Sequence, residues 1–391
     1  MLTTKPVGSW CKPEWLFSGP PTHANDDKLD KGKGHDTTWK VGWQGTPEEL
    51  ATRKEQGTVW AIKEQLATGL DIFTDGEQKR ESYVHYHLRH LNGIDFDVIT
   101  EKRYRGGKMI GGLPTFTGAV STRVLYAAQD FEFAKGVCMA QGKNPDAISI
   151  SIPGPMTIWD TTANTFYDGE EALCMALAEG VRSEVASLIA AGCKNIMIDE
   201  PVWVRYPELV KAWGGRVLDA CFKGLPGREN VQIMTHVCCS YPTKSVKSNG
   251  RAETKVYETI GPVVAASDLD GISIEHAIQP LDLKVLKLYH PKKVMLGFVA
   301  IDPDVPVEEV AAIEAKIEEA LEHIPADRLI CSNDCGCVLL TPQQARAKMT
   351  NLCVAAKNVR AKRNIVCPAA DLALIDFSSP NGGSTNGKRK R

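Results

Sequence analysis

The fold is decided by the half of the chain after residue 146, which repeats one pattern: AISISIPG (147–154), KNIMIDEP (194–201), VQIMTHVC (231–238), GISIEHA (271–277), KVMLGFVAID (293–302) and RLICSNDCG (328–336). Each segment is a short apolar run that ends in polar residues, a pattern typical of a strand buried on both faces. Segments with apolar residues at helical spacing accompany them, at 170–192 and near 207–223, 253–265, 281–289, 306–323 and 342–360. This alternation predicts βα units and a parallel sheet.

Two more strands are predicted upstream, at PVGS (6–9) and LDIFTDGE (70–77). A helix predicted over 47–68 precedes the second of them, and its start, Thr46-Pro47-Glu48-Glu49, is a capping box. Eight such units in a chain of 391 residues favour a closed (β/α)8 barrel of the TIM type over an open doubly wound sheet. No G-x-G-x-x-G segment follows a strand, which argues against a dinucleotide-binding fold.

The predicted organisation is one α/β barrel domain over residues 1–376 with additions. Residues 1–46 are expected to form an N-terminal arm, and residues 95–146 an insertion with a β-hairpin followed by a helix near 130–142. Residues 243–253 have the composition of a mobile loop. Residues 377–391 are polar, Gly-rich and basic, and we expect a disordered tail there.

Composition excludes several classes of function. The net charge of −2 gives no global field for nucleic acid, and no stretch reaches transmembrane length. The start of the chain lacks the apolar segment of a secretory signal, so we expect a cytoplasmic protein whose twelve cysteines serve metals, catalysis or packing. The basic run from Lys102 to Lys108 is interpreted as a solvated loop rather than a phosphate contact. No oligomeric state is predicted.

Polar and metal-capable residues follow the predicted strands. In a (β/α)8 barrel the carboxyl ends of the strands form the active-site face. The residues that fall at this face are Ser9, Asp75, Glu77, Asp199, Glu200, His236, Cys238, Glu275, Asp302, Asn333, Asp334 and Cys335.

Four of these residues predict a metal site. His236 and Cys238 are two positions apart, so in an extended strand both side chains point to the same side. An isolated charge such as Glu275 at the barrel mouth is costly without a partner or a metal. With Cys335, these residues supply the two sulfurs, one nitrogen and one carboxylate of a tetrahedral zinc site. Cys239 and Cys337 are alternative ligands that spacing alone does not exclude.

The acids and one tryptophan have two interpretations each. Asp199 and Glu200 either end a strand and cap a helix, or bind a substrate ammonium and transfer a proton. Glu77 has the same two interpretations, with Arg80 as its nearby ion-pair partner. Trp159 follows a tight turn and is a candidate platform for stacking a flat ring.

The motifs VGSW (7–10), DGEQKRESYVHY (75–86), PGPMTIWD (153–160), IDEP (198–201), THVC (235–238), SIEH (273–276) and NDCG (333–336) resemble those of a known family. They are similar, in order and over about residues 6–360, to the catalytic barrel of cobalamin-independent methionine synthase and its short single-barrel relatives. The resemblance implies zinc held by His236, Cys238, Glu275 and Cys335. It also implies an amino-acid substrate held by Ser9, Glu77 and Asp199, whose thiolate takes a methyl group from 5-methyltetrahydrofolate.

The chain departs from the family on the side of the methyl donor. The family carries an Asp-Ile-His sequence after the seventh strand, and its histidine donates a proton. This chain has Ala300-Ile301-Asp302, which leaves Asp302 as the candidate replacement. The family's folate-stacking tryptophan lies beyond the turn after strand three, whereas Trp159 comes earlier.

We therefore predict a zinc-dependent methyltransferase that moves a methyl group from a methylfolate-type donor to the thiolate of homocysteine or a similar small thiol. The predicted catalytic residues are Asp302, Glu77 and Asp199, and the predicted substrate-binding residues are Ser9, Glu77, Asp199, Glu200 and Trp159. One alternative is epoxide opening or another alkyl transfer by a thiol, as in epoxyalkane:coenzyme M transferases. Another is a zinc-binding barrel without turnover.

Overall fold

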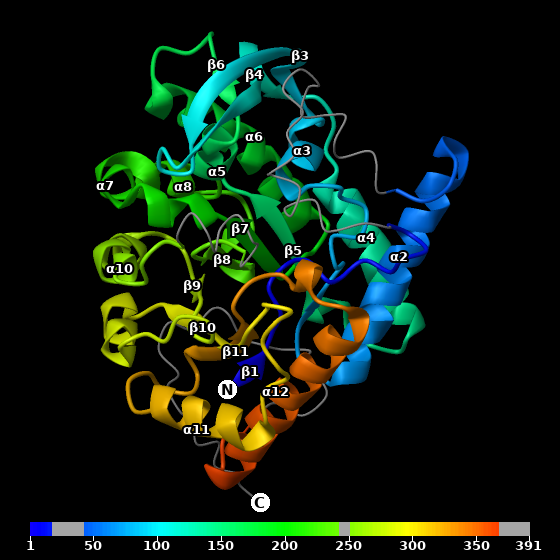
Figure 1. Cartoon of the computed structure of the whole chain (residues 1–391), viewed down its shortest axis with the longest axis vertical. Coiled ribbons are helices and arrows are strands. Elements are labelled where there is room, and N and C mark those ends of the chain that lie inside the picture. Colours follow the sequence, from blue (N-terminus) through cyan, green and yellow to red (C-terminus); the bar gives the residue numbers. More distant parts are fainter. Residues whose placement is uncertain (18–42, 242–250, 367–391) are drawn as a thin grey trace, which may run out of the picture.

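A computed structural model describes residues 1–17, 43–241 and 251–366. Within these ranges eight parallel strands form one curled sheet in the order β1-β11-β10-β9-β8-β7-β5-β2 (Figure 1). Their bounds are β1 Thr3–Thr4, β2 Phe73–Thr74, β5 Ile148–Pro153, β7 Asn195–Asp199, β8 Gln232–Val237, β9 Gly271–Ile274, β10 Lys293–Val299 and β11 Leu329–Asn333. The two ends of the sheet meet, because the Ile72 N–H donates to the Thr4 carbonyl at 3.0 Å. The predicted (β/α)8 barrel is confirmed.

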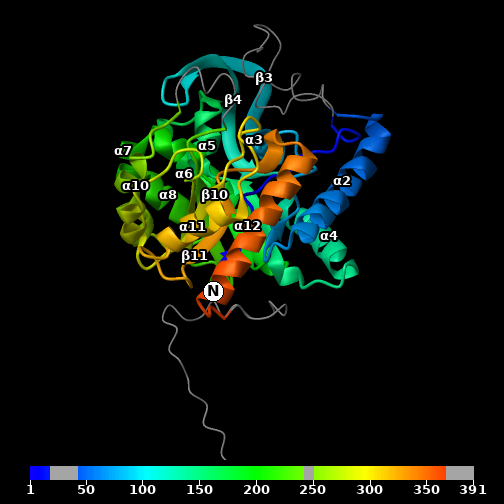
Figure 2. The same ribbon diagram turned by 60° about the horizontal axis from the view of Figure 1, so that its bottom comes forward.

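Helices cover the outside of the barrel (Figures 1 and 2). They are α2 Pro47–Thr68, α4 Ala127–Ala140, α6 Glu170–Ala190, α7 Pro207–Leu209, α8 Gly215–Ala220, α10 Val256–Ala266, α11 Val310–Ala320 and α12 Pro342–Lys362. The helix predicted over 47–68 has these bounds and the expected capping box at Thr46. The helix predicted over 207–223 is instead split by a π-helical turn at Val210–Gly214. At Gly214 the chain passes so close to Met156 that a Cβ would lie 2.6 Å from its Sδ.

A long hairpin stands on the barrel, at the top of Figure 1. Its strands are β3 Leu91–Tyr104 and β4 Met109–Thr122, and the short β6 Ala163–Asn164 pairs with β4. Two short helices, α3 Tyr83–Leu88 and α5 Pro155–Asp160, lie beneath it. The insertion predicted at 95–146 therefore begins earlier than expected. Its helix, α4, packs with α2 and α6 in the outer layer of the barrel.

Three other predictions fall wholly or largely on residues outside the described ranges. The predicted arm at 1–46 is described only to residue 17 and from 43, and its start supplies strand β1. The predicted loop at 243–253 is described only at 251–253, and the predicted tail at 377–391 is not described. In the described part, no helix has the length and apolar character needed to cross a membrane. The eleven cysteines there are all buried free thiols.

The alternation along each strand separates two apolar regions. On β8, Ile233 packs outward against the helices, whereas Met234 points into the barrel. The barrel interior is filled by a small cluster of Val7, Met197, Met234, Met295 and Ile330. Because this layer closes the barrel, side chains that follow it on the strands face the carboxyl-end opening.

Lys5 is buried in this interior, and its buried ammonium lowers the stability of the folded state at neutral pH. The residue is 1% exposed, its Nζ has no hydrogen-bond partner among the described residues, and burial lowers its pKa to about 8. At pH 7 the folded state bears the full cost of a buried charge. Between about pH 8 and the unfolded pKa of 10.5, only the unfolded chain holds the proton, so stability rises with pH.

Lys5→Met is therefore expected to raise the free energy of unfolding at pH 7 by about 3 kcal/mol, since one pKa unit is worth about 1.4 kcal/mol. The gain should shrink as the pH rises toward 10. Urea unfolding at several pH values measures this, with the exposed Lys63→Met as control. A loss of stability at pH 7 would contradict the buried, unpaired position of Lys5.

Candidate active site

One cleft lies at the carboxyl end of the barrel, with a volume of about 880 Å³ including the part open to solvent. Six residues predicted from the sequence line it: Ser9, Glu77, Asp199, His236, Cys238 and Cys335. They come from β1, β2, β7, β8 and β11 or the turns that follow, as expected for the active-site face of a (β/α)8 barrel. The structure therefore brings two of the predicted acids and three of the predicted metal ligands into the same cleft.

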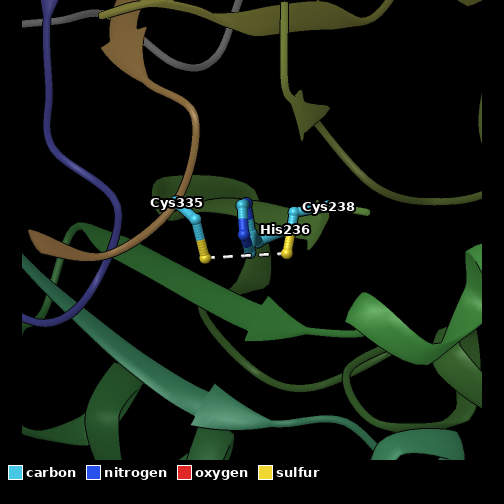
Figure 3. Close-up of side chains that lie close together, drawn as sticks. All are labelled: His236, Cys238 and Cys335. Carbon is cyan, nitrogen blue, oxygen red and sulfur yellow. Dashed lines mark hydrogen bonds between the residues drawn. The ribbon is translucent and has the colours of Figure 1, made fainter. Parts of the chain in front are cut away.

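Three metal-capable side chains converge in this cleft (Figure 3). One ligand atom each of His236, Cys238 and Cys335 lies within 4.8 Å of the others, and the two sulfurs are 3.6 Å apart. His236 Nδ1 is hydrogen-bonded to Ser273 Oγ at 2.9 Å, which fixes the ring. Its Nε2 is buried and has no partner among the described residues. Two sulfurs and a nitrogen that lacks a partner are the donor set of a zinc site.

The local charges favour a thiolate at this point. The hydrogen bond from the Cys335 thiol, against the effect of burial, holds the pKa of Cys238 well below its ordinary value, and His236 acts in the same direction. Burial lowers the pKa of His236, but the Cys238 thiolate and nearby carboxylates outweigh it and raise this pKa overall. A thiolate is the form of cysteine that binds metals.

The two alternative cysteines face other groups. The Cys239 sulfur lies 3.8 Å from the Tyr257 hydroxyl, and the Cys337 sulfur accepts a hydrogen bond from Asn333 Nδ2 at 3.4 Å. Burial raises the pKa of both thiols, that of Cys337 to about 12. Both are therefore neutral thiols, and neither belongs to the group of three.

Glu275, the predicted fourth ligand, is engaged elsewhere. Both of its oxygens lie 2.8 Å from Arg251 Nη2, and Oε2 also accepts the Cys239 N–H at 3.0 Å. Its carboxylate is not among the atoms that lie within 4.8 Å of one another in the group of His236, Cys238 and Cys335. Glu275 lies near the group, because it accepts the N–H of Cys239, the residue after Cys238. Its role as a ligand stays a prediction.

Two acids face the cleft beside the soft ligands. Burial raises the pKa of Asp199 to about 8, and its Oδ1 is buried without a partner among the described residues. Glu77 lies 3.9 Å from Arg80, as its sequence spacing predicted, and burial raises its pKa. The Glu77 carboxylate lies directly against the backbone of Gly8. Only glycine fits there, because a Cβ on residue 8 would lie 2.4 Å from Glu77 Oε1. Acids with an open acceptor are suited to bind an ammonium group.

Two residues predicted to bind substrate, Glu200 and Trp159, are not among the residues that line the cleft, and their predicted role stays a prediction. Glu200 does not line the cleft: its carboxylate accepts the N–H groups of Met156 and Thr157 at 2.9 and 2.8 Å and caps helix α5. The helix that Glu200 caps precedes it in the chain, whereas the capping alternative concerned the helix that follows. Trp159 is 4% exposed, with its ring packed against Tyr206 and covered by Lys102 Nζ. A ring enclosed in this way offers no free face for stacking a substrate.

Asp302 also lies apart from the cleft. Its Oδ1 accepts the Asp304 N–H at 3.0 Å, which stabilises the turn after β10. It is not among the residues that line the cleft. The geometry therefore gives no support to a proton-donating role for Asp302, which stays a prediction from the sequence.

The side chains of the cleft that were not predicted include Tyr83, Arg105, Arg205 and Tyr241. The Tyr241 hydroxyl lies 3.4 Å from Ser9 Oγ and so extends the polar wall beside Cys335. Arg105 belongs to the basic run that was interpreted as a solvated loop, and the hairpin brings it to the barrel mouth. The sequence carried no signal for this, because it does not show how the hairpin folds over the barrel.

Comparison with known proteins agrees with this arrangement. The family model described as "Cobalamin-independent synthase, Catalytic domain" matches residues 36–358. A methionine synthase from Saccharolobus solfataricus is 25% identical over 367 residues, covering 92% of this chain and 95% of that protein. A methionine synthase from Sulfurisphaera tokodaii is 24% identical, covering 92% of this chain and 93% of that protein.

Solved structures show the same fold. A B12-independent methionine synthase from a Shewanella species, in complex with selenomethionine, matches with a TM-score of 0.79 and 28% identity, covering 94% of this chain and all of that one. A putative vitamin-B12-independent methionine synthase from Listeria monocytogenes matches with a TM-score of 0.65 over 92% of this chain and 99% of that one. At 19% identity, the second match shows the fold alone. The chain therefore belongs to the cobalamin-independent methionine synthase family, through its catalytic domain.

Proposed function

We propose that this protein is a zinc-dependent methyltransferase that transfers a methyl group from a methylfolate-type donor to the sulfur of homocysteine or a similar small thiol. The observation that carries the proposal is the convergence of His236, Cys238 and Cys335 in the cleft of a chain that belongs to this family. Sulfur-rich ligation suits a metal that must take up one further thiol.

The residues present fit zinc. His236 has one ring nitrogen committed to Ser273 and the other buried without a partner, and the sulfurs of Cys238 and Cys335 lie beside it. A zinc ion held by these three side chains would lower the pKa of a substrate thiol and keep it as a nucleophilic thiolate. We keep Glu275 as the proposed fourth ligand, for which its carboxylate must exchange its contact with Arg251.

The remaining polar groups would orient the thiol. Asp199 and Glu77 would bind the ammonium of an amino-acid substrate, because both acids face the cleft and Asp199 Oδ1 has an open position. The hydroxyls of Ser9 and Tyr241, which also line the cleft, would bind its carboxylate. Contacts of this kind would hold the substrate sulfur beside the proposed zinc ligands. Holding the sulfur and the alkyl donor in a fixed geometry raises the reaction rate. The Shewanella relative was solved with selenomethionine, which supports a methionine-like product.

A second candidate function is favoured by the donor side of the cleft. Trp159 is enclosed by its neighbours, and Asp302 lies outside the cleft, so neither the predicted ring platform nor the predicted proton donor is in place. A reaction in which the same thiolate opens an epoxide or takes another alkyl group needs neither of them. We therefore keep thiol alkylation by a different electrophile as the alternative.

The proposal is tested by product analysis with the zinc-loaded protein and four substrate pairs. Homocysteine or 2-mercaptoethanesulfonate is combined with 5-methyltetrahydrofolate or with a short epoxyalkane. We expect methionine from homocysteine and 5-methyltetrahydrofolate, detected by mass spectrometry. A thioether only with the epoxyalkane would establish the alternative, and the absence of product from every pair would overturn both.

A further inference from the structure

The cleft has a second end that the soft ligands and acids do not use. Arg105, from the turn between β3 and β4, and Arg205, from the 3-10 helix Pro201–Arg205 after β7, both line it. The two residues are close, since a Cβ placed on Gly106, next to Arg105, would lie 3.4 Å from Arg205 Cβ, and the charge of Arg105 acts on Arg205. Two positive charges in one part of a cleft repel each other and attract a negatively charged group.

The structure holds the Arg105 backbone in a demanding conformation. Its φ is +53°, a left-handed value that non-glycine residues rarely adopt, and its N–H donates to both oxygens of Asp160 at 3.0 and 3.1 Å. Among the described residues, four non-glycine residues have positive φ, and three of them, Glu77, Arg105 and Ser240, line the cleft. Backbone strain of this kind gathers at functional sites.

Arg205 has an unmet hydrogen-bonding capacity. Its Nε is buried and has no acceptor among the described residues, and burial together with Arg105 lowers its pKa. Among the described residues that line the cleft, Asp160 is the acid that contacts Arg105. Its carboxylate already accepts the Arg105 N–H and the Tyr206 hydroxyl, the latter at 2.7 Å. In the described part of the chain, one acid beside two arginines leaves net positive charge here.

The rest of the basic run does not contribute to this end. Lys102 Nζ donates to the carbonyls of Trp159 and Thr162 at 2.6 and 2.9 Å, and Arg103 and Lys108 are exposed. Among the described residues, the cationic side chains that line the cleft are Arg105 and Arg205, whose planar guanidinium groups suit bidentate contact with an oxyanion.

We propose that Arg105 and Arg205 form a subsite for an oxyanion group, a carboxylate, sulfonate or phosphate, carried by one of the two substrates of the cleft. This inference rests on the proposed function, because it assumes that a thiol and an alkyl donor meet in this cleft. The group can belong to the thiol or to the donor, and the chemistry that Arg105 and Arg205 recognise is the same in both cases.

Binding measurements with the zinc-loaded full chain test the subsite. Isothermal titration compares wild type, Arg205→Gln, Arg205→Lys and the exposed control Arg216→Gln. The thiol arm uses 2-mercaptoethanesulfonate against uncharged 2-mercaptoethanol, and the donor arm uses 5-methyltetrahydrofolate against a methylated tetrahydropterin without the glutamate tail. Arg105→Gly is a second variant, because glycine accepts the left-handed turn without strain.

We expect Arg205→Gln to raise the Kd of the charged probe in one arm at least about tenfold, with partial recovery in Arg205→Lys. The arm that responds identifies the substrate carrying the oxyanion. The uncharged probes, the zinc content and Arg216→Gln should show no change. Unchanged Kd values for both charged probes in Arg205→Gln and Arg105→Gly would overturn the subsite. The two proposals can fail separately, because binding needs no turnover. If the subsite is wrong, the wild type would still form methionine. If the proposed function is wrong, no methionine would form, but the Kd of the charged probe would still depend on the arginines.

Discussion

Replacing Cys335 with serine is expected to lower zinc affinity and methyl transfer by more than about 100-fold, since loss of a partner that only supports a ligand already costs about 10- to 100-fold. The substitution removes one of the two sulfurs that lie 3.6 Å apart. It also removes the thiol whose hydrogen bond lowers the pKa of Cys238. Zinc content after dialysis and the rate of methionine formation measure both effects.

Cys337→Ser is the matched control for this prediction. Cys337 lies two residues further along and is also buried, but its sulfur faces Asn333 rather than His236 and Cys238. The control should keep its zinc and most of its activity. Equal loss of zinc in both variants would mean that the two substitutions act through folding. Retention of zinc in Cys335→Ser would remove Cys335 from the site.

Asp199→Asn is expected to lower kcat/KM for the thiol about 30- to 5,000-fold while leaving zinc in place, since about 1.4 kcal/mol corresponds to a factor of ten. The reason is that Asp199 offers a buried, unpartnered oxygen to the substrate ammonium, and removing one partner of a buried charge pair costs about 2–5 kcal/mol. Most of the effect should appear in KM, because the contact is made before and during the reaction alike. Steady-state kinetics with varied homocysteine tests this.

The neighbouring acid supplies the contrast. Glu200→Gln should lower the free energy of unfolding by about 1–3 kcal/mol, because an amide cannot accept all of the Met156 and Thr157 hydrogen bonds at the start of α5. Its KM for the thiol should stay close to that of wild type, since Glu200 does not line the cleft. If Glu200→Gln raised KM as much as Asp199→Asn does, the division of roles between these two acids would be wrong.

The barrel and the soft ligands were predictable for a local reason. Strands buried on both faces, as at 147–154 and 231–238, are near-continuous apolar runs, and the rule that barrel sites lie at strand ends then places His236, Cys238 and Cys335 together. The capping box at Thr46 likewise carries its own signal for the start of α2. Each of these features depends on a short segment of the sequence and can therefore be predicted from it.

The donor side was not predictable, because its contacts join distant segments. Trp159 is covered by Lys102 from the hairpin, at 4.7 Å from its ring centre, and Arg105 enters the cleft from the same hairpin. No local sequence pattern predicts where the hairpin of β3 and β4, with 14 residues in each strand, will lie relative to the barrel. Glu275 illustrates the same limit, since its contact with Arg251 spans 24 positions and leaves the carboxylate outside the group of three.

The central claim is that His236, Cys238 and Cys335 hold zinc, and zinc analysis of the purified full chain with X-ray absorption at the zinc edge tests it most directly. We expect about one zinc per chain, with two sulfur ligands near about 2.3 Å and a nitrogen near about 2.0 Å. Addition of homocysteine should raise the number of sulfur ligands by one. The absence of zinc, or zinc surrounded only by oxygen and nitrogen, would contradict the account.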